Sequence, residues 1–315
     1  MKSIINMKTP FICTILLVSL CIASVGCKKL ANGSGSGDGG NNGGNNGGTV
    51  GKYTNPNTTS VICDYDVSDT AYTNHGWTKT FEDDFTGDLS KWNLIKGGLI
   101  MEEQCYEPAN VQIAGGAVQI AAKKETVSGP KTVGNDTMQN FNYTSGWMVS
   151  KSTFVANSST PKVRIVARIK MASGYGLTSL FYGFGGGAWP TTGEIDFAET
   201  QGDNTKVYAT DYAYGSSANS NVVSGGILYN PVTEDLSSCY HLYVMEWTQN
   251  SLNSYIDGKL VETKTKGGYV SSLFGKPQYL TFSLPIGGLY YSQLKTANIQ
   301  GGTMSIDYVK VFTSN

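Results

Sequence analysis

The segment Lys162–Lys170 has the clearest alternation of side-chain polarity in the chain, and it constrains the fold most strongly. Apolar and basic residues take alternate positions: Val163, Ile165, Ala167 and Ile169 against Lys162, Arg164, Arg168 and Lys170. Successive side chains of a strand point to opposite faces of its sheet. One face of this strand is therefore expected to be buried and the other wetted, as in a sandwich of two sheets.

Other short apolar segments predict further strands. They are Trp77–Phe85, Val111–Ile113, Val118–Ala122, Tyr240–Thr248, Ser251–Ile256, Lys259–Thr265, Gln278–Pro285 and Met304–Phe312. Gly115-Gly116 and Asp257-Gly258 are typical of tight hairpin turns between such strands. We find no pattern for an amphipathic helix longer than a few turns. The sequence therefore predicts an all-β fold, a β-jelly-roll sandwich of two curved antiparallel sheets with a concave face.

Three carboxylates gather in the segment Gly193–Thr200, at Glu194, Asp196 and Glu199. Regular pleating would place Glu194 and Asp196 on one face and Glu199 on the other. A β-bulge between Asp196 and Glu199 would bring all three to the same face. The glutamate backbones would then lie about 13 Å apart, and side chains leaning inward suit the carboxyl separation of about 5 Å used by retaining glycosidases.

From Trp77 to Phe312 the chain resembles glycoside hydrolase family 16, the β-jelly-roll enzymes that include laminarinases, lichenases, agarases and endo-β-galactosidases. The motif Gly193–Thr200 resembles the active-site strand of that family, and Trp77–Phe85 and His241–Trp247 resemble two of its other strands. By this resemblance Glu194 is the nucleophile, Glu199 is the general acid/base, and Asp196 tunes both. Like charges this close cannot all ionise freely, so the pKa of one carboxyl is expected to rise.

The resemblance implies an endo-acting retaining β-glycoside hydrolase that cleaves a β-linked polysaccharide, by default a β-1,3-glucan of the laminarin type. Three stretches depart from the laminarinase-like pattern: Met101-Glu102, Leu177–Tyr182, and the pair Tyr208 and Tyr212. An endo-β-galactosidase acting on a galactan or on a galactose-containing host or algal glycan is therefore an alternative. A non-catalytic surface glycan-binding module is an alternative of another class. Hydrolysis and transglycosylation are not separated by the sequence.

Sugar rings pack on aromatic side chains and hydrogen-bond to polar ones. We expect the substrate to contact Trp189, Trp147, Tyr212, Tyr106 and Glu102, with Tyr182 and Tyr290 as further aromatic candidates. Trp92 and Trp247 are assigned instead to the core.

The first part of the chain reads as an export and anchoring region. Residues 1–27 are expected to be a lipoprotein signal peptide, with the apolar run Phe11–Val25 and lipidation of Cys27. Residues 28–52 are rich in Gly, Asn and Ser and predict a flexible tether, 53–76 a lead-in segment, and 77–315 the hydrolase domain. The expected location is the outer membrane, held only by the lipid anchor, at the cell surface or on the periplasmic face.

Charge and composition limit the partners. The formal net charge of −1 gives no electrostatic reason to expect nucleic acid. With two histidines and no ligand cluster, zinc chemistry is not expected and no cofactor is required, although the resemblance allows a structural calcium at Asp307. Without an association signal, we expect a monomer. In an exported protein, Cys63, Cys105 and Cys239 allow one disulfide, and the sequence does not choose the pair.

Overall fold

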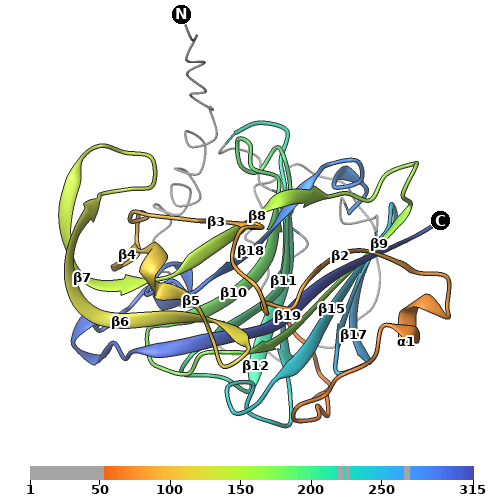
Figure 1. The fold of residues 1–315 in the computed structure, drawn as a ribbon, viewed down its shortest axis with the longest axis horizontal. Helices are drawn as coiled ribbons and strands as arrows, with labels where there is room; N and C mark the ends of the chain where they lie inside the picture. Colours follow the sequence, from red (N-terminus) through yellow and green to blue (C-terminus); the bar gives the residue numbers. More distant parts are fainter. Residues whose placement is uncertain (1–52, 219–222, 225–226, 266–269) are drawn as a thin grey trace, which may run out of the picture.

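The computed structural model describes residues 53–218, 223–224, 227–265 and 270–315, which form two packed β-sheets (Figure 1). In this part of the chain the α-helical content is one short element, α1 (Thr70–Thr73). Four 3₁₀ turns accompany it: η2 (Pro108–Asn110), η4 (Val270–Ser272), η5 (Leu289–Tyr291) and η6 (Thr296–Asn298). No helix in the described ranges has the length and apolar character needed to cross a membrane.

The sheet that carries the three acids, called here the inner sheet, has nine strands. Its order is β1-β14-β12-β11-β10-β18-β8-β3, with β13 paired to β12. The strands are β1 (Tyr53–Thr54), β3 (Trp92–Leu94), β8 (Trp147–Phe154), β10 (Thr178–Phe184), β11 (Glu194–Gln201), β12 (Val207–Tyr214), β13 (Val223–Ser224), β14 (Leu228–Pro231) and β18 (Gln278–Ser283). The acidic strand β11 therefore lies near the middle of this sheet, flanked by β10 and β12.

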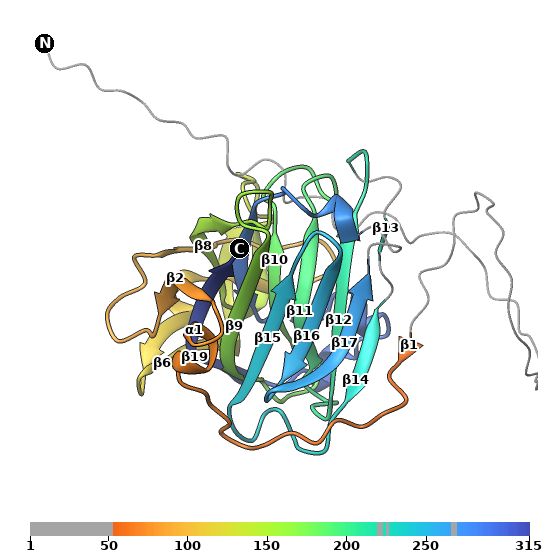
Figure 2. The ribbon, with the colours of Figure 1, turned by 90° about the vertical axis from the view of Figure 1, so that its right-hand side faces the viewer.

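The second sheet, the outer sheet, has ten strands in the order β17-β16-β15-β9-β19-β6-β7-β4, with β2 paired to β19 and β5 to β6. The strands are β2 (Thr78–Asp83), β4 (Gln104–Tyr106), β5 (Val111–Ala114), β6 (Ala117–Pro130), β7 (Met138–Ser145), β9 (Lys162–Lys170), β15 (His241–Trp247), β16 (Ser251–Ile256), β17 (Lys259–Thr265) and β19 (Gly302–Ser314). Figure 2 shows β15, β16 and β17 side by side. Pairing is antiparallel except for β1 with β14 and β4 with β7, so both sheets are mixed rather than purely antiparallel as predicted.

The core lies between the sheets and follows from the alternation in their strands. The apolar side of β9 is buried, as its sequence predicts, and Trp92 and Trp247 are buried as well. The rings of Phe181 and Phe282 stack with their centroids 4.6 Å apart. Burying aromatic and aliphatic surface of this kind is the main stabilising contribution in a sandwich. The jelly-roll prediction is confirmed by this arrangement.

Residues 53–76 pack against the domain. Strand β1 pairs with β14, and the ring of Tyr72 contacts Phe312 with centroids 5.0 Å apart. Cys63 forms a disulfide with Cys239, while Cys105 is a buried free thiol. The structure thus selects the pairing that the sequence left open, and the disulfide ties the lead-in segment to the sheet. The expected signal peptide and tether lie outside the described residues.

Candidate active site

A β-bulge in β11 puts the three acids on one face of the inner sheet. Asp196 pairs with Asp211 and Glu199 with Ala209, so three steps along β11 match two steps along β12. The pairing with β10 shifts at the same place. The extra residue is accommodated in the core, where Ile195, Phe197 and Ala198 are all buried. Glu194, Asp196 and Glu199 consequently share the opposite face, as the sequence predicted.

Strand pairing identifies the neighbours of the acids, because directly paired residues of adjacent strands point to the same face. Tyr182 and Asp211 flank Asp196, Leu180 and Ala209 flank Glu199, and Phe184 and Ala213 flank Glu194. We call the face formed by these residues the concave face. The acids therefore lie along one strand, with aromatic and aliphatic side chains on the β10 side and small or acidic ones on the β12 side.

Glu194 is held by the loop that precedes it. The indole Nε1 of Trp189 donates a hydrogen bond to Oε2 of Glu194. Burial raises the pKa of Glu194 to about 7, and the bond from Trp189 opposes that rise. Trp189 itself is only partly buried. It therefore lies at the site with one edge bonded to the carboxylate and with surface left over for a ligand.

Glu199 is held by a residue that is distant in the sequence, in the 3₁₀ turn η5. The hydroxyl of Tyr290, in η5, donates a hydrogen bond to Oε2 of Glu199. Burial raises the pKa of Glu199 to about 8, with smaller contributions in the same direction from Asp211 and Glu194, and the bond from Tyr290 opposes the rise. Burial therefore favours the protonated form of Glu199, the form that a proton donor needs.

Asp196 is the most buried of the three acids, with 8% of its surface exposed. Its pKa lies well above its ordinary value, first because of burial and then because of Glu194, Glu199 and Asp211. Burial thus favours the protonated form of Asp196, and a protonated carboxyl can donate a hydrogen bond to a neighbouring carboxylate or to a ligand.

A fourth carboxylate, Asp211, belongs to the site and was missed in the sequence. It lies directly across from Asp196 on β12. The amide N–H of the next residue, Tyr212, donates a hydrogen bond to Oδ1 of Asp211 (2.8 Å). The alternation of Val207–Tyr214 predicts that Asp211 shares a face with Ala209 and Ala213. Only the pairing with β11 shows that this is the face of the acids.

Glu102 lies beside the concave face, in the wall formed by the loop before β4. The hydroxyl of Tyr106 (2.9 Å) and the amide of Gln104 (2.6 Å) both donate to Oε2 of Glu102. Burial raises the pKa of Glu102 to about 7. Burial raises the pKa of Tyr182 well above its ordinary value, and the negative charges of Glu194 and Glu102 add to the rise. Tyr182 therefore lies near both carboxyls. Glu102 thus lies near the acids, and its predicted contact with the substrate stays a prediction.

The prediction that Trp147 and Tyr106 offer their rings to a sugar is not supported by their positions. Both are buried, with 4% and 1% of their surface exposed, in a small cluster with Val133 and Val149. Their rings pack edge to face with centroids 5.2 Å apart. Residues of the loops before β4 and β7 cover them, so they support the wall and do not form its surface.

Tyr212 also needs correction. It pairs with Ile195, which faces the core, and 1% of its surface is exposed. Tyr212 therefore points between the sheets, away from the acids. Of the predicted aromatic contacts, Trp189 is the one that remains at the site with partial exposure, and Tyr182 and Tyr290 are partly exposed beside it.

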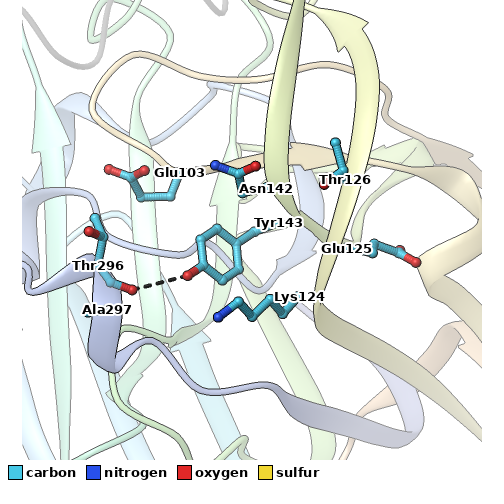
Figure 3. Close-up of a pocket in the computed structure, with 8 residues that line it drawn as sticks. All are labelled: Glu103, Lys124, Glu125, Thr126, Asn142, Tyr143, Thr296 and Ala297. Atoms are coloured by element: carbon cyan, nitrogen blue, oxygen red, sulfur yellow. Dashed lines mark hydrogen bonds between the residues drawn. The ribbon is translucent and has the colours of Figure 1, made fainter.

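A separate pocket of about 460 Å³ opens beside the β6–β7 hairpin (Figure 3). Its lining residues are Glu103, Lys124, Glu125, Thr126, Asn142, Tyr143, Thr296 and Ala297. The hydroxyl of Tyr143 donates to the carbonyl of Thr296 across it (3.1 Å). None of these residues comes from β10, β11 or β12, so this pocket is not part of the acidic site.

The residues present do not fit the structural calcium that the resemblance allowed at Asp307. Oδ2 of Asp307 accepts a hydrogen bond from the guanidinium of Arg168 (2.7 Å), which already balances its charge. Across the described ranges, no three His, Cys, Asp or Glu side chains are grouped so that they could hold a metal ion.

Comparison with known proteins gives a consistent picture. The sequence model described as "Glycosyl hydrolases family 16" matches residues 106–310. The chain is 26% identical over 266 residues to glucan endo-1,3-beta-glucosidase A1 of Niallia circulans, covering 75% of this chain but 38% of that protein. The chain therefore spans well under half the length of that relative. It is also 30% identical over 129 residues to a keratan-sulfate endo-1,4-beta-galactosidase of Sphingobacterium multivorum, covering 40% of this chain and 29% of the relative.

Among solved structures, the fold is similar to that of the endo-beta-1,3-glucanase of Pyrococcus furiosus. The TM-score is 0.64 at 25% sequence identity, and the match covers 76% of this chain and 95% of that one.

Proposed function

Because the chain belongs to the glycosyl hydrolases of family 16, we propose that it is an endo-acting, retaining β-glycoside hydrolase whose catalytic residues are Glu194, Asp196 and Glu199. The observation that carries the proposal is the bulge in β11. It brings a nucleophile and a proton donor to one face of one strand, where both can reach the same glycosidic bond. Enzymes of this family need no cofactor.

The two glutamates take different roles in the proposed reaction. The nucleophile must be ionised and the acid must be protonated before the first step. Burial raises the pKa of Glu194 to about 7 and that of Glu199 to about 8, so one carboxyl of the pair can be ionised while the other is protonated near neutral pH. We therefore assign Glu194 as the nucleophile and Glu199 as the acid, as the resemblance of Gly193–Thr200 to the active-site strand of the family implies.

In the first step, Glu194 attacks the anomeric carbon while Glu199 gives its proton to the departing glycosidic oxygen, which leaves as a hydroxyl. In the second step, Glu199 takes a proton from water, whose oxygen displaces Glu194 and restores both carboxyls. Asp196 lies between the two along β11, and burial favours its protonated form, which can donate a hydrogen bond to ionised Glu194. The net result is hydrolysis with retained configuration.

We propose that the sugar bound over β10 contacts Glu102 and packs against Trp189. Glu102 and Glu194 both lie near Tyr182. Hydrogen bonds from Tyr106 and Gln104 hold the carboxylate of Glu102 in one orientation. A side chain held in this way loses little freedom when it hydrogen-bonds to a ligand. Trp147, Tyr106 and Tyr212 have no part in direct contact.

The substrate we propose is a β-1,3-glucan of the laminarin type. The glucanase relative and the glucanase structure support it, since each matches about three quarters of this chain. A β-galactan is the second candidate, supported by the partial match to the galactosidase. A transglycosylase would use the same covalent intermediate.

One experiment tests activity and substrate together. Purified protein is incubated with laminarin, lichenan, agarose and desulfated keratan, and the products are sized. We expect a ladder of oligosaccharides from laminarin. Binding without cleavage across the panel would reject the enzyme in favour of a glycan-binding module. In a parallel incubation, short oligosaccharides are added as acceptors. Products longer than these acceptors would identify transglycosylation.

The roles of the two acids are tested with chemical rescue. Glu194→Gln and Glu199→Gln are expected to abolish turnover while retaining the fold, checked by circular dichroism. Glu194→Gly with azide should give a glycosyl azide of inverted configuration, and Glu199→Gly with azide one of retained configuration. Wild-type activity in either Gln variant, or the opposite configurations, would overturn the assignment.

We also propose that the protein is a monomeric lipoprotein of the outer membrane, anchored through Cys27 and a tether over residues 28–52. The supporting observation is the sequence of residues 1–52. Expression of wild type and Cys27→Ser in a bacterial host, with an alkyne fatty-acid label, is the test. Label and membrane association should be lost together in the variant. Protease treatment of intact cells distinguishes the cell surface from the periplasmic face, and gel filtration of the released domain tests the monomer.

A further inference from the structure

A disulfide, a histidine and an aspartate form a cluster that the proposed reaction does not use. Sγ of Cys239, which is bonded to Cys63, lies 3.6 Å from Nε2 of His241. Nδ1 of the same imidazole lies 2.8 Å from Oδ2 of Asp257. His241 and Asp257 are buried, with 0% and 2% of their surface exposed. They belong to β15 and to the turn between β16 and β17, so the cluster is part of the outer sheet and separate from the three acids.

The hydrogen bonds of Asp257 fix the orientation of the imidazole. Its carboxylate also accepts from the amide N–H groups of Ile62 (2.9 Å) and Leu242 (2.8 Å). A carboxylate only accepts, so Nδ1 of His241 carries a hydrogen and donates it to Asp257. A second proton taken up by the ring then resides on Nε2, beside the sulfur of Cys239. An imidazolium in this position stabilises a thiolate.

The two sulfurs of the disulfide differ in access and in surroundings. Cys63 is exposed, whereas Cys239 has 6% of its surface exposed. Sγ of Cys239 also lies 3.5 Å from the hydroxyl of Ser238. A thiolate accepts hydrogen bonds more strongly than a disulfide sulfur, so the contacts with His241 and Ser238 strengthen when the bond breaks. Cys63 is therefore the sulfur open to attack, and Cys239 is the better leaving group.

We propose that Cys63–Cys239 is a thiol–disulfide exchange site for a dithiol reductant, with His241 as the residue that stabilises the leaving thiolate. One thiol of the reductant ionises and attacks Sγ of Cys63, and the electron pair of the broken bond passes to Sγ of Cys239. The proton lost by the reductant is matched by the proton that His241 holds at Nε2. The second thiol of the reductant then attacks the mixed disulfide, which releases Cys63 and oxidises the reductant to its cyclic disulfide.

Hydrogen bonds on both sides of Cys63 keep the exchange reversible. The amide of Ile62 remains bonded to Asp257, and the amide of Asp64 donates to the carbonyl of Tyr240 (2.9 Å). Neither bond depends on the disulfide. Reduced Cys63 therefore stays close to Cys239, and an excess of oxidised dithiol closes the bond again.

Reduction of the folded protein by dithiothreitol at pH 7, without denaturant, tests the role of His241. Samples are quenched by alkylation and the reduced fraction is measured by mass spectrometry. His241→Asn offers an amide donor in place of Nδ1 but has no counterpart of Nε2. We expect its second-order rate constant for reduction to fall at least roughly tenfold, because the leaving thiolate loses its partner.

The direction of this change separates the proposed role from a structural one. A variant that merely loosened the fold would expose the disulfide and be reduced faster than the wild type. The matched control is His75→Asn, which removes the other histidine, an exposed one, and should leave the rate constant unchanged. Reduction of His241→Asn at the wild-type rate or faster would overturn the role of His241.

The site of attack is tested on the wild type and needs no variant. The folded protein is treated with the monothiol glutathione, trapped with N-ethylmaleimide and digested, and the peptides are identified by mass spectrometry. We expect glutathione on Cys63 and maleimide on Cys239. Glutathione on Cys239 instead, or a disulfide that is reduced only in denaturant, would overturn the exchange site. None of these measurements uses hydrolysis, so they stand or fall independently of the proposed function.

Discussion

The hydroxyl of Tyr290 donates a hydrogen bond to the carboxylate of Glu199, although the two residues are 91 positions apart in the sequence. This bond joins η5 to the acidic strand. It favours the ionised form of Glu199, while burial favours the protonated form. The position of one loop therefore adjusts both the orientation and the proton affinity of the proposed acid.

Tyr290→Phe should show this directly. Loss of the hydroxyl raises the pKa of Glu199, so the basic limb of kcat/KM against pH moves to higher pH. Loss of orientation should lower kcat at neutral pH by roughly tenfold. The matched control is Tyr291→Phe, in the same turn, whose hydroxyl bonds to Asp203 (2.7 Å) and not to Glu199. A basic limb that moves equally in both variants would contradict a specific role for Tyr290.

The wild-type profile should be bell-shaped and narrow. Below about pH 7 the nucleophile Glu194 takes up a proton, and above about pH 8 the acid Glu199 loses one, so activity falls on both sides. The two limbs belong to the interacting pair of carboxyls. Initial rates at substrate concentrations well below KM, measured from pH 5 to 10 in steps of about half a unit, give this profile directly. A profile flat from pH 5 to 9 would show that these carboxyls do not control the reaction.

Trp189→Phe keeps an aromatic ring at the site but removes the donor to Glu194. Because that bond lowers the pKa of Glu194, its loss should move the acidic limb to higher pH and lower kcat/KM at pH 6 more than at pH 8. Trp77→Phe, on the outer sheet, makes the same chemical change where the ring packs on Arg164. Its pH profile is expected to match that of the wild type.

Glu199→Gln should stabilise the protein at high pH while abolishing activity. The pKa of Glu199 is raised from its ordinary value of 4.5 to about 8 in the folded protein. A raised pKa means that the stabilising contribution is complete below about pH 4.5 and is lost as the pH rises through about 8. Glutamine has no proton to lose, so we expect the variant to be more stable than the wild type at pH 9 and similar to it at pH 4.5. Urea unfolding at the two pH values measures this, with exposed Glu234→Gln as the control.

Asp257 is expected to be a principal point of stability outside the site. Its carboxylate accepts from the amides of Ile62 (2.9 Å) and Leu242 (2.8 Å) and contacts Nδ1 of His241 (2.8 Å). It thereby joins the lead-in segment to β15, near the disulfide. Asp257→Ala leaves these buried groups without partners, so we expect a loss of about 2–4 kcal/mol in the free energy of unfolding. Asp257→Asn, which keeps the shape of the side chain, should lose less.

Much of the fold follows from local sequence patterns. The alternation of Lys162–Lys170 predicts a strand with one buried face, and Asp257-Gly258 predicts a hairpin whose two residues have positive φ angles, 46° and 76°. Both predictions are confirmed. The spacing of Glu194, Asp196 and Glu199 also predicts the bulge, because a chemical requirement for three acids on one face is met by one extra residue.

For other residues, contacts with segments distant in the sequence decide whether the side chain faces the site or the core. Asp211 joins the acids because β12 pairs with β11 in one particular alignment, and a shift by one residue would have brought Tyr212 to the site in its place. Trp147 and Tyr106 are excluded because loops cover them. The choice of Cys239 over Cys105 as the partner of Cys63 likewise depends on how the lead-in segment crosses the sheet.

The sequence alone therefore determined the strands, their alternating faces and the three acids, since these depend on the geometry of neighbouring residues along one strand. The tertiary structure decided the fourth acid, the bonds from Trp189 and Tyr290, the burial of the predicted aromatic platforms and the disulfide. These depend on which strands pair, in which alignment, and on what covers them, and such long-range contacts leave no periodic pattern in the chain.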